Sequence, residues 1–177
     1  MTADIITTDR LVLRSVCDAD LGRLYDITFS DPEVMFHAFE GKALSKETAA
    51  DFFQHAFDHD GNGKQLGALI LRSTATTIGF SGLMPCSVLG ERDHEIGFVL
   101  GKEFWRKGYA TEIGIAQIEY GVEVAGCKRL LAIVAAGNAA SRSVLRKIGM
   151  TRHSTTETKQ RGIREVYMAQ GDTWHKP

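Results

Sequence analysis

The order in which hydrophobic periodicity changes along the chain constrains its fold more than any other feature of the sequence. A strand-like run is followed by a helix-prone stretch, the period then shortens to that of β-strands, and helical spacing returns later. Strands and helices do not alternate regularly, which argues against a doubly wound parallel sheet. The predicted elements are a strand at 11–14, helices within 18–29, from 31 and within 45–57, strands at 66–72, 77–84 and 94–100, a helix at 109–124, a strand at 129–135, a helix at 138–148, and strands at 151–156 and 163–169.

These elements predict an α+β fold, with a mixed sheet flanked by helices in a single domain that spans residues 1–177. A chain of 177 residues is long enough for one hydrophobic core and short for two. Hydrophobic residues make up 44% of the sequence and charged residues 24%, an ordinary globular balance that gives no sign of disorder.

Charge and hydropathy exclude several classes of partner. The formal net charge is -1, so no overall basic character indicates binding to nucleic acid or to an acidic membrane surface. No apolar run approaches the roughly 20 residues of a membrane span. Residues 1–8 lack the basic and apolar regions of a signal peptide. We therefore expect a soluble, cytoplasmic protein.

The cysteines give no indication of a metal site or of disulfides. Cys17, Cys86 and Cys127 are far apart and odd in number, and no CxxC pair is present. We expect buried free thiols and no bound metal.

The segment from Glu95 to Thr111 carries most of the chemical information in the sequence. A predicted strand ends at Leu100, a loop with three basic residues follows, and a predicted helix begins near Tyr109. The N-terminus of a helix presents unpaired backbone N–H groups and the positive end of the helix dipole, so a pyrophosphate can bind there. Gly108 would let the backbone approach a phosphate closely. An ordinary strand-to-helix connection explains the same spacing, and spacing alone leaves both interpretations open.

Other phosphate-binding and hydrolase signatures are absent. The sequence has no GxxxxGK[ST] motif and no GxGxxG after a strand. Gly79-Phe80-Ser81-Gly82 is one position short of the GxSxG nucleophile elbow, because Leu83 stands where the second glycine is required. His94-Glu95 has no following histidine that would complete a zinc-binding helix.

A second segment, from Asn138 to Met150, has a structural interpretation for each residue taken singly. Asn138 is a good N-cap for the predicted helix, and Ser141 falls in the first turn of that helix. Gly149 ends the helix in the manner of a C-terminal cap.

Taken together and in this order, the two segments resemble the GNAT superfamily of acetyltransferases, and within it the branch that includes ribosomal-protein N-terminal (alanine/serine) acetyltransferases. The resemblance extends over nearly the whole chain and implies a GNAT-like, mostly antiparallel sheet of six to seven strands. It rests on Thr8-Asp9-Arg10-Leu11-Val12-Leu13-Arg14, on Asp31-Pro32-Glu33-Val34, on Glu95-Ile96-Gly97-Phe98-Val99-Leu100, on Phe104-Trp105-Arg106-Lys107-Gly108-Tyr109-Ala110-Thr111-Glu112, and on Asn138, Ser141, Leu145, Lys147, Gly149 and Met150.

The sequence departs from the general pattern of the superfamily at two positions. Trp105 stands three residues before Gly108, where most members have Gln or Arg, and this branch tolerates tryptophan there. We expect its side chain to pack under the loop. Leu145 stands seven residues after Asn138, where many relatives place a tyrosine that acts as general acid. An acid role for tyrosine at this position is therefore excluded.

The resemblance implies acetyl-CoA as the acetyl donor and assigns residues to bind it. Backbone groups of Phe98, Val99 and Leu100 would bind the pantetheine and the acetyl carbonyl. A strand N–H directed at the carbonyl oxygen would stabilise the developing oxyanion. Asn138 would bind the pantetheine arm, together with Ser141. Backbone N–H groups would hold the pyrophosphate at Arg106, Lys107, Gly108, Tyr109, Ala110 and Thr111.

Two residues are candidates for catalysis in a direct attack of an amine on the thioester. Glu95 is the first candidate for general base, because a carboxylate in an otherwise apolar strand is costly unless it is paired or used. A structural ion pair explains Glu95 as well. Ser141 is predicted, by the resemblance, to protonate the leaving thiolate or to orient the thioester sulfur. His94, on the opposite strand face, is a weaker candidate for the base, and Glu112 is interpreted as structural.

The acceptor is a primary amine in the first two of three hypotheses. The first is a protein N-terminal α-amine, the second a small-molecule amine, and the third a non-catalytic acyl-CoA-binding module. The acceptor pocket would lie between the N-terminal helices and the last two strands, and the oligomeric state, monomer or homodimer, is open. Five phenylalanines can line the acceptor side or pack the core: Phe36, Phe39, Phe52, Phe53 and Phe57.

Overall fold

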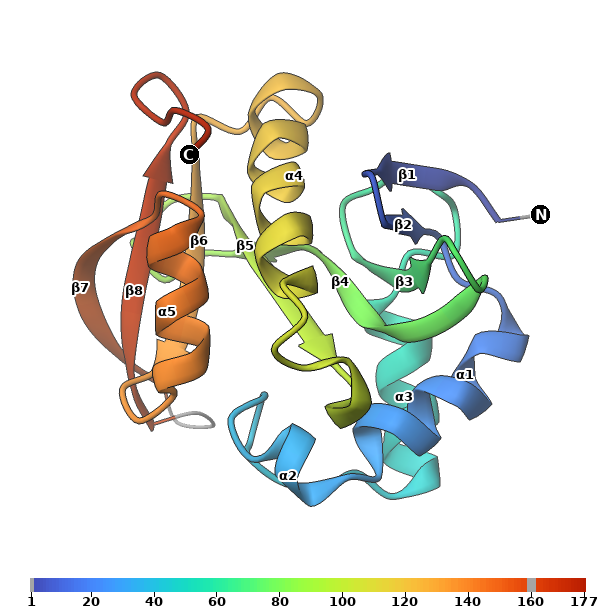
Figure 1. Cartoon of the computed structure of the whole chain (residues 1–177). Helices are drawn as coiled ribbons and strands as arrows, with labels where there is room; N and C mark the ends of the chain where they lie inside the picture. Colours follow the sequence, from blue (N-terminus) through green and yellow to red (C-terminus); the bar gives the residue numbers. More distant parts are fainter. Residues whose placement is uncertain (1, 159–161) are drawn as a thin grey trace.

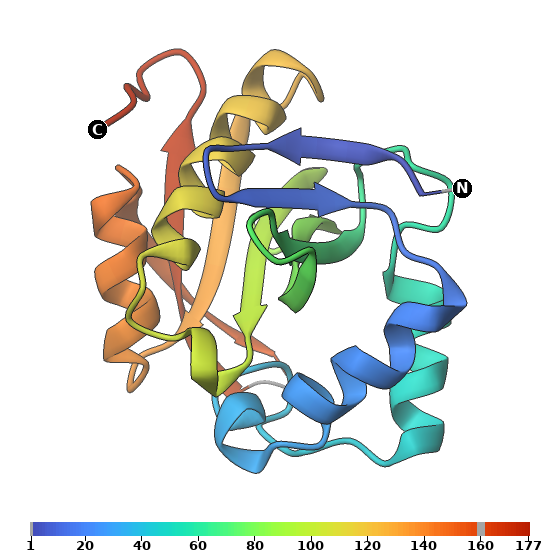
Figure 2. The same ribbon diagram turned by 45° about the vertical axis from the view of Figure 1, so that its right-hand side comes forward.

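The computed structural model describes residues 2–158 and 162–177, which form one twisted sheet with helices on both faces (Figures 1 and 2). The sheet has eight strands in the order β1-β2-β3-β4-β5-β6-β8-β7. Neighbouring strands pair antiparallel except β5 and β6, which pair parallel. The predicted α+β fold with a mixed, mostly antiparallel sheet is thus confirmed.

The elements follow the predicted order closely. The strands are β1 (Asp4–Thr7), β2 (Leu11–Arg14), β3 (Leu66–Leu71), β4 (Thr76–Cys86), β5 (Asp93–Leu100), β6 (Arg129–Ala135), β7 (Thr151–Thr158) and β8 (Gly162–Gln170). The helices are α1 (Asp18–Leu24), the π-helical turn η1 (Tyr25–Phe29), α2 (Pro32–Met35), α3 (Lys46–Ala56), the short η2 (Lys102–Phe104), α4 (Tyr109–Glu123) and α5 (Ala139–Lys147).

The eighth strand is β1, which the sequence pattern did not indicate. It is four residues long, pairs with β2 alone at the edge of the sheet, and buries only Ile6. A strand this short and this exposed has no hydrophobic alternation that a sequence pattern could reveal.

Side chains cap the N-termini of α2 and α3. Asp31 accepts hydrogen bonds from the backbone N–H groups of Glu33 (2.8 Å) and Val34 (3.3 Å) at the start of α2. Ser45 accepts from the N–H of Thr48 (3.1 Å) at the start of α3. These bonds satisfy N–H groups that have no partner within the helix.

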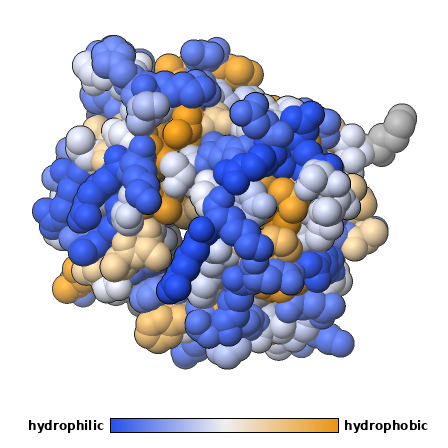
Figure 3. All heavy atoms as spheres, viewed as in Figure 1, coloured by the Kyte–Doolittle hydropathy of each residue, from blue (hydrophilic) through white to orange (hydrophobic). Residues whose placement is uncertain are grey.

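Alternation along the strands divides the core between the two faces of the sheet. Leu69 of β3 packs with Ile113 of α4, whereas the adjacent Ala68 packs with Phe29 and Phe53 of η1 and α3. Helices α4 and α5 therefore cover one face, and α1, η1 and α3 cover the other (Figures 1 and 2). Seen from the side of α4 and α5, apolar residues come to the surface between these helices and most of the remaining surface is hydrophilic (Figure 3).

The one parallel pair in the sheet is short, and this opens the fold. Strands β5 and β6 pair only at His94 with Leu130 and at Glu95 with Leu131. Beyond these residues each strand keeps its antiparallel partner on the other side, β4 or β8. The carboxyl-terminal halves of β5 and β6 thus face a gap rather than each other.

None of the helices in residues 2–158 and 162–177 is long and apolar enough to cross a membrane.

The three cysteines are free, as expected, but Cys17 is exposed and Cys86 and Cys127 are only partly buried. The expectation of buried cysteines was therefore wrong for Cys17, which precedes α1 at its surface end.

Candidate functional site

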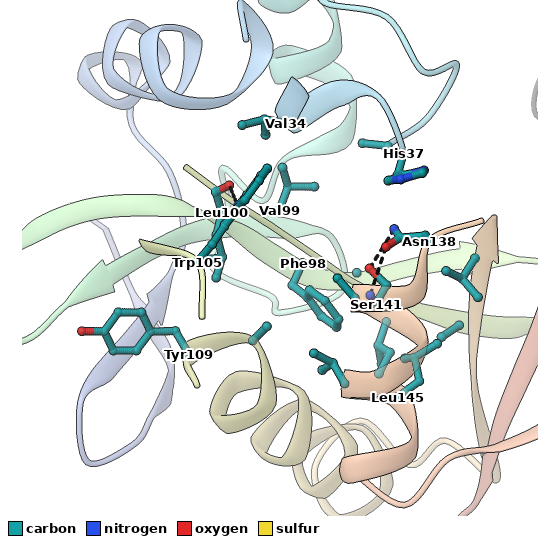
Figure 4. Close-up of a pocket in the computed structure, with 18 of the residues that line it drawn as sticks. Val34, His37, Phe98, Val99, Leu100, Trp105, Tyr109, Asn138, Ser141 and Leu145 are labelled. Atoms are coloured by element: carbon teal, nitrogen blue, oxygen red, sulfur yellow. Dashed lines mark hydrogen bonds between the residues drawn. The ribbon is translucent and has the colours of Figure 1, made fainter. Parts of the chain in front are cut away.

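A cavity of about 670 Å³ occupies the gap between β5 and β6. It is bounded by the C-terminal half of β5, the loop that leads into α4, the first turns of α5, and the region of α2 (Figure 4). The structure brings nearly all of the predicted site residues to this cavity. Glu95, Phe98, Val99, Leu100, Arg106, Gly108, Tyr109, Ala110, Thr111, Asn138 and Ser141 line it.

Lys107 is the predicted cofactor-binding residue that does not line the cavity. Its Nζ lies 5.6 Å from the centre of the Phe104 ring, and its backbone carbonyl accepts a hydrogen bond from Arg10. Its side chain therefore lies over Phe104, and its backbone N–H is one of the row of donors described below.

The backbone of β5 directs alternate peptide groups into the cavity. The N–H of Gly101 donates to the carbonyl of Ile78 on β4 (3.0 Å), and the carbonyl of Gly97 accepts from Ser81 of β4 (2.7 Å). Peptide groups alternate in direction along a strand. The N–H groups of Phe98 and Leu100 therefore point away from β4, toward the gap where β6 has separated.

Trp105 lies differently from the prediction. We expected it to pack under the loop, but its indole lines the cavity, is 38% exposed, and donates from Nε1 to the carbonyl of Leu100 (2.8 Å; Figure 4). One lone pair of that carbonyl is thus engaged by Trp105, while the N–H of Leu100 still points toward the gap.

The loop before α4 forms a concave row of backbone donors. Arg106 has φ of 60° and Gly108 has φ of 82°, so the chain turns twice through the left-handed region. Within the described part of the chain, the six N–H groups from Arg106 to Thr111 have no hydrogen-bond acceptor. Successive N–H groups of this kind, at the positive end of a helix dipole, form an anion-binding nest. The loop therefore fits a pyrophosphate.

Arg10 fixes this loop to the edge of the sheet, a role that the sequence analysis missed. Its Nη1 donates to the carbonyl of Lys107 (3.0 Å), and its guanidinium lies 4.7 Å from the centre of the Tyr109 ring. Its Nε and its backbone N–H donate to Glu112 at 2.6 and 2.9 Å. Thr8 adds a third donor to the same carboxylate (2.6 Å).

Glu112 accordingly turns away from the nest, as its structural interpretation requires. Burial alone would raise the pKa of its carboxyl, but the hydrogen bonds from Thr8 and Arg10 outweigh burial and lower the pKa below the ordinary value of 4.5. The carboxylate is thus ionised at neutral pH and holds Arg10 in place. About 100 residues separate the two in the chain, so no local spacing could reveal the pair.

Asn138 and Ser141 form a reciprocal pair at the start of α5. The Oδ1 of Asn138 accepts from the N–H of Ser141 (3.0 Å), which is the predicted N-cap. Its Nδ2 donates to the Oγ of Ser141 (2.9 Å; Figure 4). Because Asn138 supplies the donor in this second bond, the hydroxyl proton of Ser141 is left to donate to a group in the cavity.

Leu145 lies one turn further along α5 and is buried, with 2% exposure. It lines the cavity at the position where a tyrosine general acid was excluded from the sequence. Ser141 is therefore the hydroxyl that α5 presents at this wall of the cavity.

Glu95 occupies the point at which the strands separate. It is the last residue of β5 that pairs with β6, and it is 7% exposed while lining the cavity. This position, at the bottom of the cleft, suits a general base. Burial among strands also suits a carboxylate that is ion-paired. Both interpretations of Glu95 thus stay predictions.

The side of the cavity on which the acceptor was predicted is lined by residues of α2 and of the loop that follows it. Of the five phenylalanines considered, Phe39 lines the cavity, Phe53 and Phe57 are buried in the core, Phe52 packs against that core, and Phe36 is exposed. Phe39 has φ of 45°, and its carbonyl accepts from Arg164 of β8 (3.3 Å). This bond joins the two sides between which the acceptor pocket was predicted.

No cluster of metal ligands accompanies the cavity. Residues 2–158 and 162–177 contain no group of three or more His, Cys, Asp or Glu that could hold an ion.

Comparison with known proteins identifies relatives that match most of the chain. A family model described as "Acetyltransferase (GNAT) domain" matches residues 10–151. The uncharacterized N-acetyltransferase YnaD of Bacillus subtilis (strain 168) is 33% identical over 147 residues, which cover 83% of this chain and 82% of that protein.

Solved structures share the fold at lower identity. A GNAT-family acetyltransferase from Bacillus anthracis superposes with a TM-score of 0.79 at 23% identity, covering 94% of this chain and 98% of that one. Spermidine N-acetyltransferase from Vibrio cholerae, solved with CoA and spermine, gives 0.74 at 14% identity, with 93% and 98% covered. The ribosomal-protein-S5-alanine acetyltransferase from Vibrio fischeri gives 0.67 at 13%, with 96% and 97% covered.

Proposed function

The chain belongs to the GNAT acetyltransferase family and is an acetyl-CoA-dependent acyltransferase, and from this premise we propose that it acetylates the α-amine of a peptide or protein N-terminus. The observation that carries the proposal is the cleft itself. It joins a nest of free backbone donors to a largely apolar pocket through the point where Glu95 sits.

We propose that the two ends of the cleft have separate tasks. Acetyl-CoA supplies an acetyl group activated as a thioester. The N–H groups from Arg106 to Thr111 would hold its pyrophosphate, since they have no acceptor among the described residues. The N–H groups of Phe98 and Leu100 would hold the pantetheine arm and the acetyl carbonyl, with the Asn138–Ser141 pair at the opposite wall.

The N–H of Phe98 is proposed to stabilise charge during the reaction. The amine nitrogen forms a bond to the acetyl carbon, the carbonyl oxygen gains negative charge, and the carbon–sulfur bond then breaks. A backbone donor fixed in the sheet needs no reorganisation as this charge develops, which is the basis of oxyanion stabilisation. β5 supplies such a donor because its pairing with β6 ends at Glu95.

Glu95 is proposed to accept the proton that the attacking amine loses. An α-amine with a pKa near 8 is about one-tenth neutral at pH 7, whereas a lysine near 10.4 is neutral in about one molecule in 2,500. Deprotonating the lysine costs about 3 kcal/mol more. A weak carboxylate base, acting directly or through water, therefore suffices for an α-amine and is poorly matched to a lysine.

Ser141 is proposed to orient the thioester sulfur. Its oxygen accepts a hydrogen bond from Asn138, so its hydroxyl group can donate a hydrogen bond to the sulfur as the thiolate leaves. A serine hydroxyl is a poor acid, and the thiolate can take its final proton from water.

The charges of the cavity favour an acceptor with a single positive charge. Among the described residues that line it, the carboxylates are Glu33 and Glu95. Glu33 is ion-paired with Lys102 at 2.5 Å. A polyamine carries several positive charges and would need several carboxylates along its length, more than the two that line this cavity in the described part of the chain.

The test is a competition between two amines on one peptide. A peptide with a free N-terminal alanine and an internal lysine is incubated with acetyl-CoA, and the acetylated position is located by fragment mass spectrometry. We expect acetylation of the α-amine, and a value of kcat/KM at least about 10 times that for spermidine, in keeping with the difference in neutral amine. Preferential acetylation of spermidine would favour the second hypothesis, a small-molecule amine, and would contradict the first.

A further inference from the structure

The Gly79-Phe80-Ser81-Gly82 segment has no role in the proposed reaction, yet it holds a fully buried hydroxyl. Ser81 of β4 is 0% exposed, and it faces Gln117 of α4, which is also 0% exposed. Both side chains lie under the strand that lines the cleft. Buried polar groups of this kind are costly unless they make hydrogen bonds, so their partners show what they do.

Both side chains bind one backbone atom. The Oγ of Ser81 donates to the carbonyl of Gly97 (2.7 Å), and the Nε2 of Gln117 donates to the same carbonyl (3.3 Å). Nε2 also donates to the Oγ of Ser81 (2.7 Å), which closes a triangle. Gly97 belongs to β5 two residues after Glu95, where the pairing with β6 has ended.

The orientation of the Gln117 amide is fixed by its partners. A carbonyl accepts hydrogen bonds and cannot donate, so the nitrogen of Gln117, and not its oxygen, must face Gly97. This leaves the Oε1 of Gln117 buried without a hydrogen-bond partner among the described residues. An unpartnered buried acceptor destabilises a fold, and an apolar side chain of similar size would avoid that cost. The presence of a glutamine at this position therefore calls for a benefit that outweighs this loss of stability.

The consequence of the triangle lies on the other side of the peptide bond. The described residues contain no cis peptide bonds, and in a trans peptide the C=O and the following N–H point in opposite directions. Donors that hold the Gly97 carbonyl toward β4 and α4 therefore hold the N–H of Phe98 toward the cleft. In an ordinary sheet the neighbouring strand would fix this N–H, but here β6 has separated.

Two glycines that flank Phe80 and Ser81 let β4 approach its neighbours closely, Gly79 on the side of β5 and Gly82 on the side of β3. A Cβ on Gly79 would lie 2.1 Å from the carbonyl oxygen of Val99, and a Cβ on Gly82 would lie 2.3 Å from that of Gln65. Neither position can hold a side chain while β4 keeps its distance from its neighbours. The segment that fails as a nucleophile elbow thus has the small residues that a buried backbone clamp requires.

We propose that Gln117 and Ser81 are positioning residues for acetyl transfer: they clamp the Gly97–Phe98 peptide so that the Phe98 N–H is directed at the acetyl carbonyl. The proposal rests on the proposed function, in which that N–H stabilises the oxyanion. Neither side chain touches the substrate, and both act through the backbone of β5.

The first test separates turnover from binding in the whole chain. In Gln117→Met and Ser81→Ala we expect kcat to fall about 10-fold, less than the 100- to 1,000-fold that loss of an oxyanion donor costs. The KM for acetyl-CoA should change less than about twofold, because the nest is untouched. Ile118→Val, at the next buried position of α4, is the control, with unchanged kcat. Unchanged kcat in both clamp variants would overturn the proposal.

The second test measures the polarisation of the thioester carbonyl of bound acetyl-CoA, and it does not require turnover. Infrared difference spectra of [1-¹³C]acetyl-CoA bound to each protein report the stretching frequency of the thioester carbonyl. We expect the frequency to be lower on the unaltered protein than on Gln117→Met, because a directed N–H weakens the C=O bond. Equal frequencies would overturn the proposal, even if Ser81→Ala does not fold. Absence of acetylated amine with the unaltered protein would instead refute the proposed function, while this spectrum still decides the role of the clamp.

Discussion

The two ends of the cleft are built in different ways. The end that is proposed to bind acetyl-CoA consists mainly of backbone groups from one continuous stretch, the C-terminal half of β5 and the loop up to Thr111. The side chains of Asn138 and Ser141 at the start of α5 lie opposite. The other end, proposed for the acceptor, is lined by Val34, His37 and Phe39 from α2 and the loop after it, and Arg164 of β8 donates to the carbonyl of Phe39 from far along the chain. A short motif can specify the first kind of site because glycines and helix starts set its geometry, whereas the second depends on which distant side chains meet.

This difference explains why the donor was predictable from the sequence and the acceptor was not. It also predicts that substitutions at the donor end change the binding of acetyl-CoA, and that substitutions where the two ends meet change turnover. The substitutions below test that division, beginning with the largest expected effect.

Gly108→Val should abolish the donor end. A β-branched residue is strained at φ of 82°, and its side chain would intrude beside the unbonded N–H groups. We expect the Kd for acetyl-CoA, measured by isothermal titration calorimetry, to rise at least about 100-fold, which is about 2.7 kcal/mol. Gly126→Val is the matched control: it has φ of 70° after α4, with open space around its Cβ position. Equal Kd in both variants would contradict the nest.

Glu95→Gln tests the point where the two ends meet. If the carboxylate is the base, kcat/KM for an N-terminal peptide should fall about 100-fold, at the lower end of what general base catalysis contributes. The Kd for acetyl-CoA should stay within about twofold, since no phosphate contact changes. Glu91→Gln, at a carboxylate whose side chain is 75% exposed, is the control. A normal kcat/KM with a lower melting temperature would identify Glu95 as a structural ion pair.

Ser141→Ala should lower kcat about 10-fold without weakening the binding of acetyl-CoA, because the orienting hydroxyl is lost while the N-cap made by Asn138 is kept. Ser143→Ala, at an exposed position of the same helix, serves as control. Steady-state kinetics with saturating peptide measures the effect. A turnover equal to that of the control would remove Ser141 from the mechanism.

Arg10→Met should have the smallest effect, because it loosens the loop without removing a backbone donor. We expect the Kd for acetyl-CoA to rise about fivefold, or about 1 kcal/mol. Arg72→Met is the control: Arg72 donates to the carbonyls of Thr8 and Asp9 in the same turn but does not reach the loop. Identical Kd values in the two variants would show that Arg10 does not position the nest.

The pH dependence of this tie follows from the lowered pKa of Glu112. A carboxyl with a pKa below its ordinary value of 4.5 contributes stability that is complete above that value and is lost as the pH falls through the lowered pKa. The stability that the contact between Arg10 and Glu112 contributes should therefore be constant across neutral pH.

Local signals predicted most of the fold. Asn138 caps α5 as expected, and Gly149 adopts the left-handed conformation expected after a helix. β1 escaped prediction because it is short and lies at the edge of the sheet. The contacts of Trp105 and Arg10 escaped it because their partners are set by the tertiary fold: a carbonyl at the end of β5 and a carboxylate about 100 residues away. The acceptor pocket escaped prediction for the same reason.

The measurement that tests the account most directly is the stoichiometry of acetyl transfer. Thiol released from acetyl-CoA is followed together with acetylated product, for N-terminal peptides and small amines offered separately. The account predicts thiol and acetylated α-amine in equal amounts, with the peptide as the faster acceptor. Tight binding of acetyl-CoA without thiol release from any acceptor would contradict it, and would indicate a binding module in place of an enzyme.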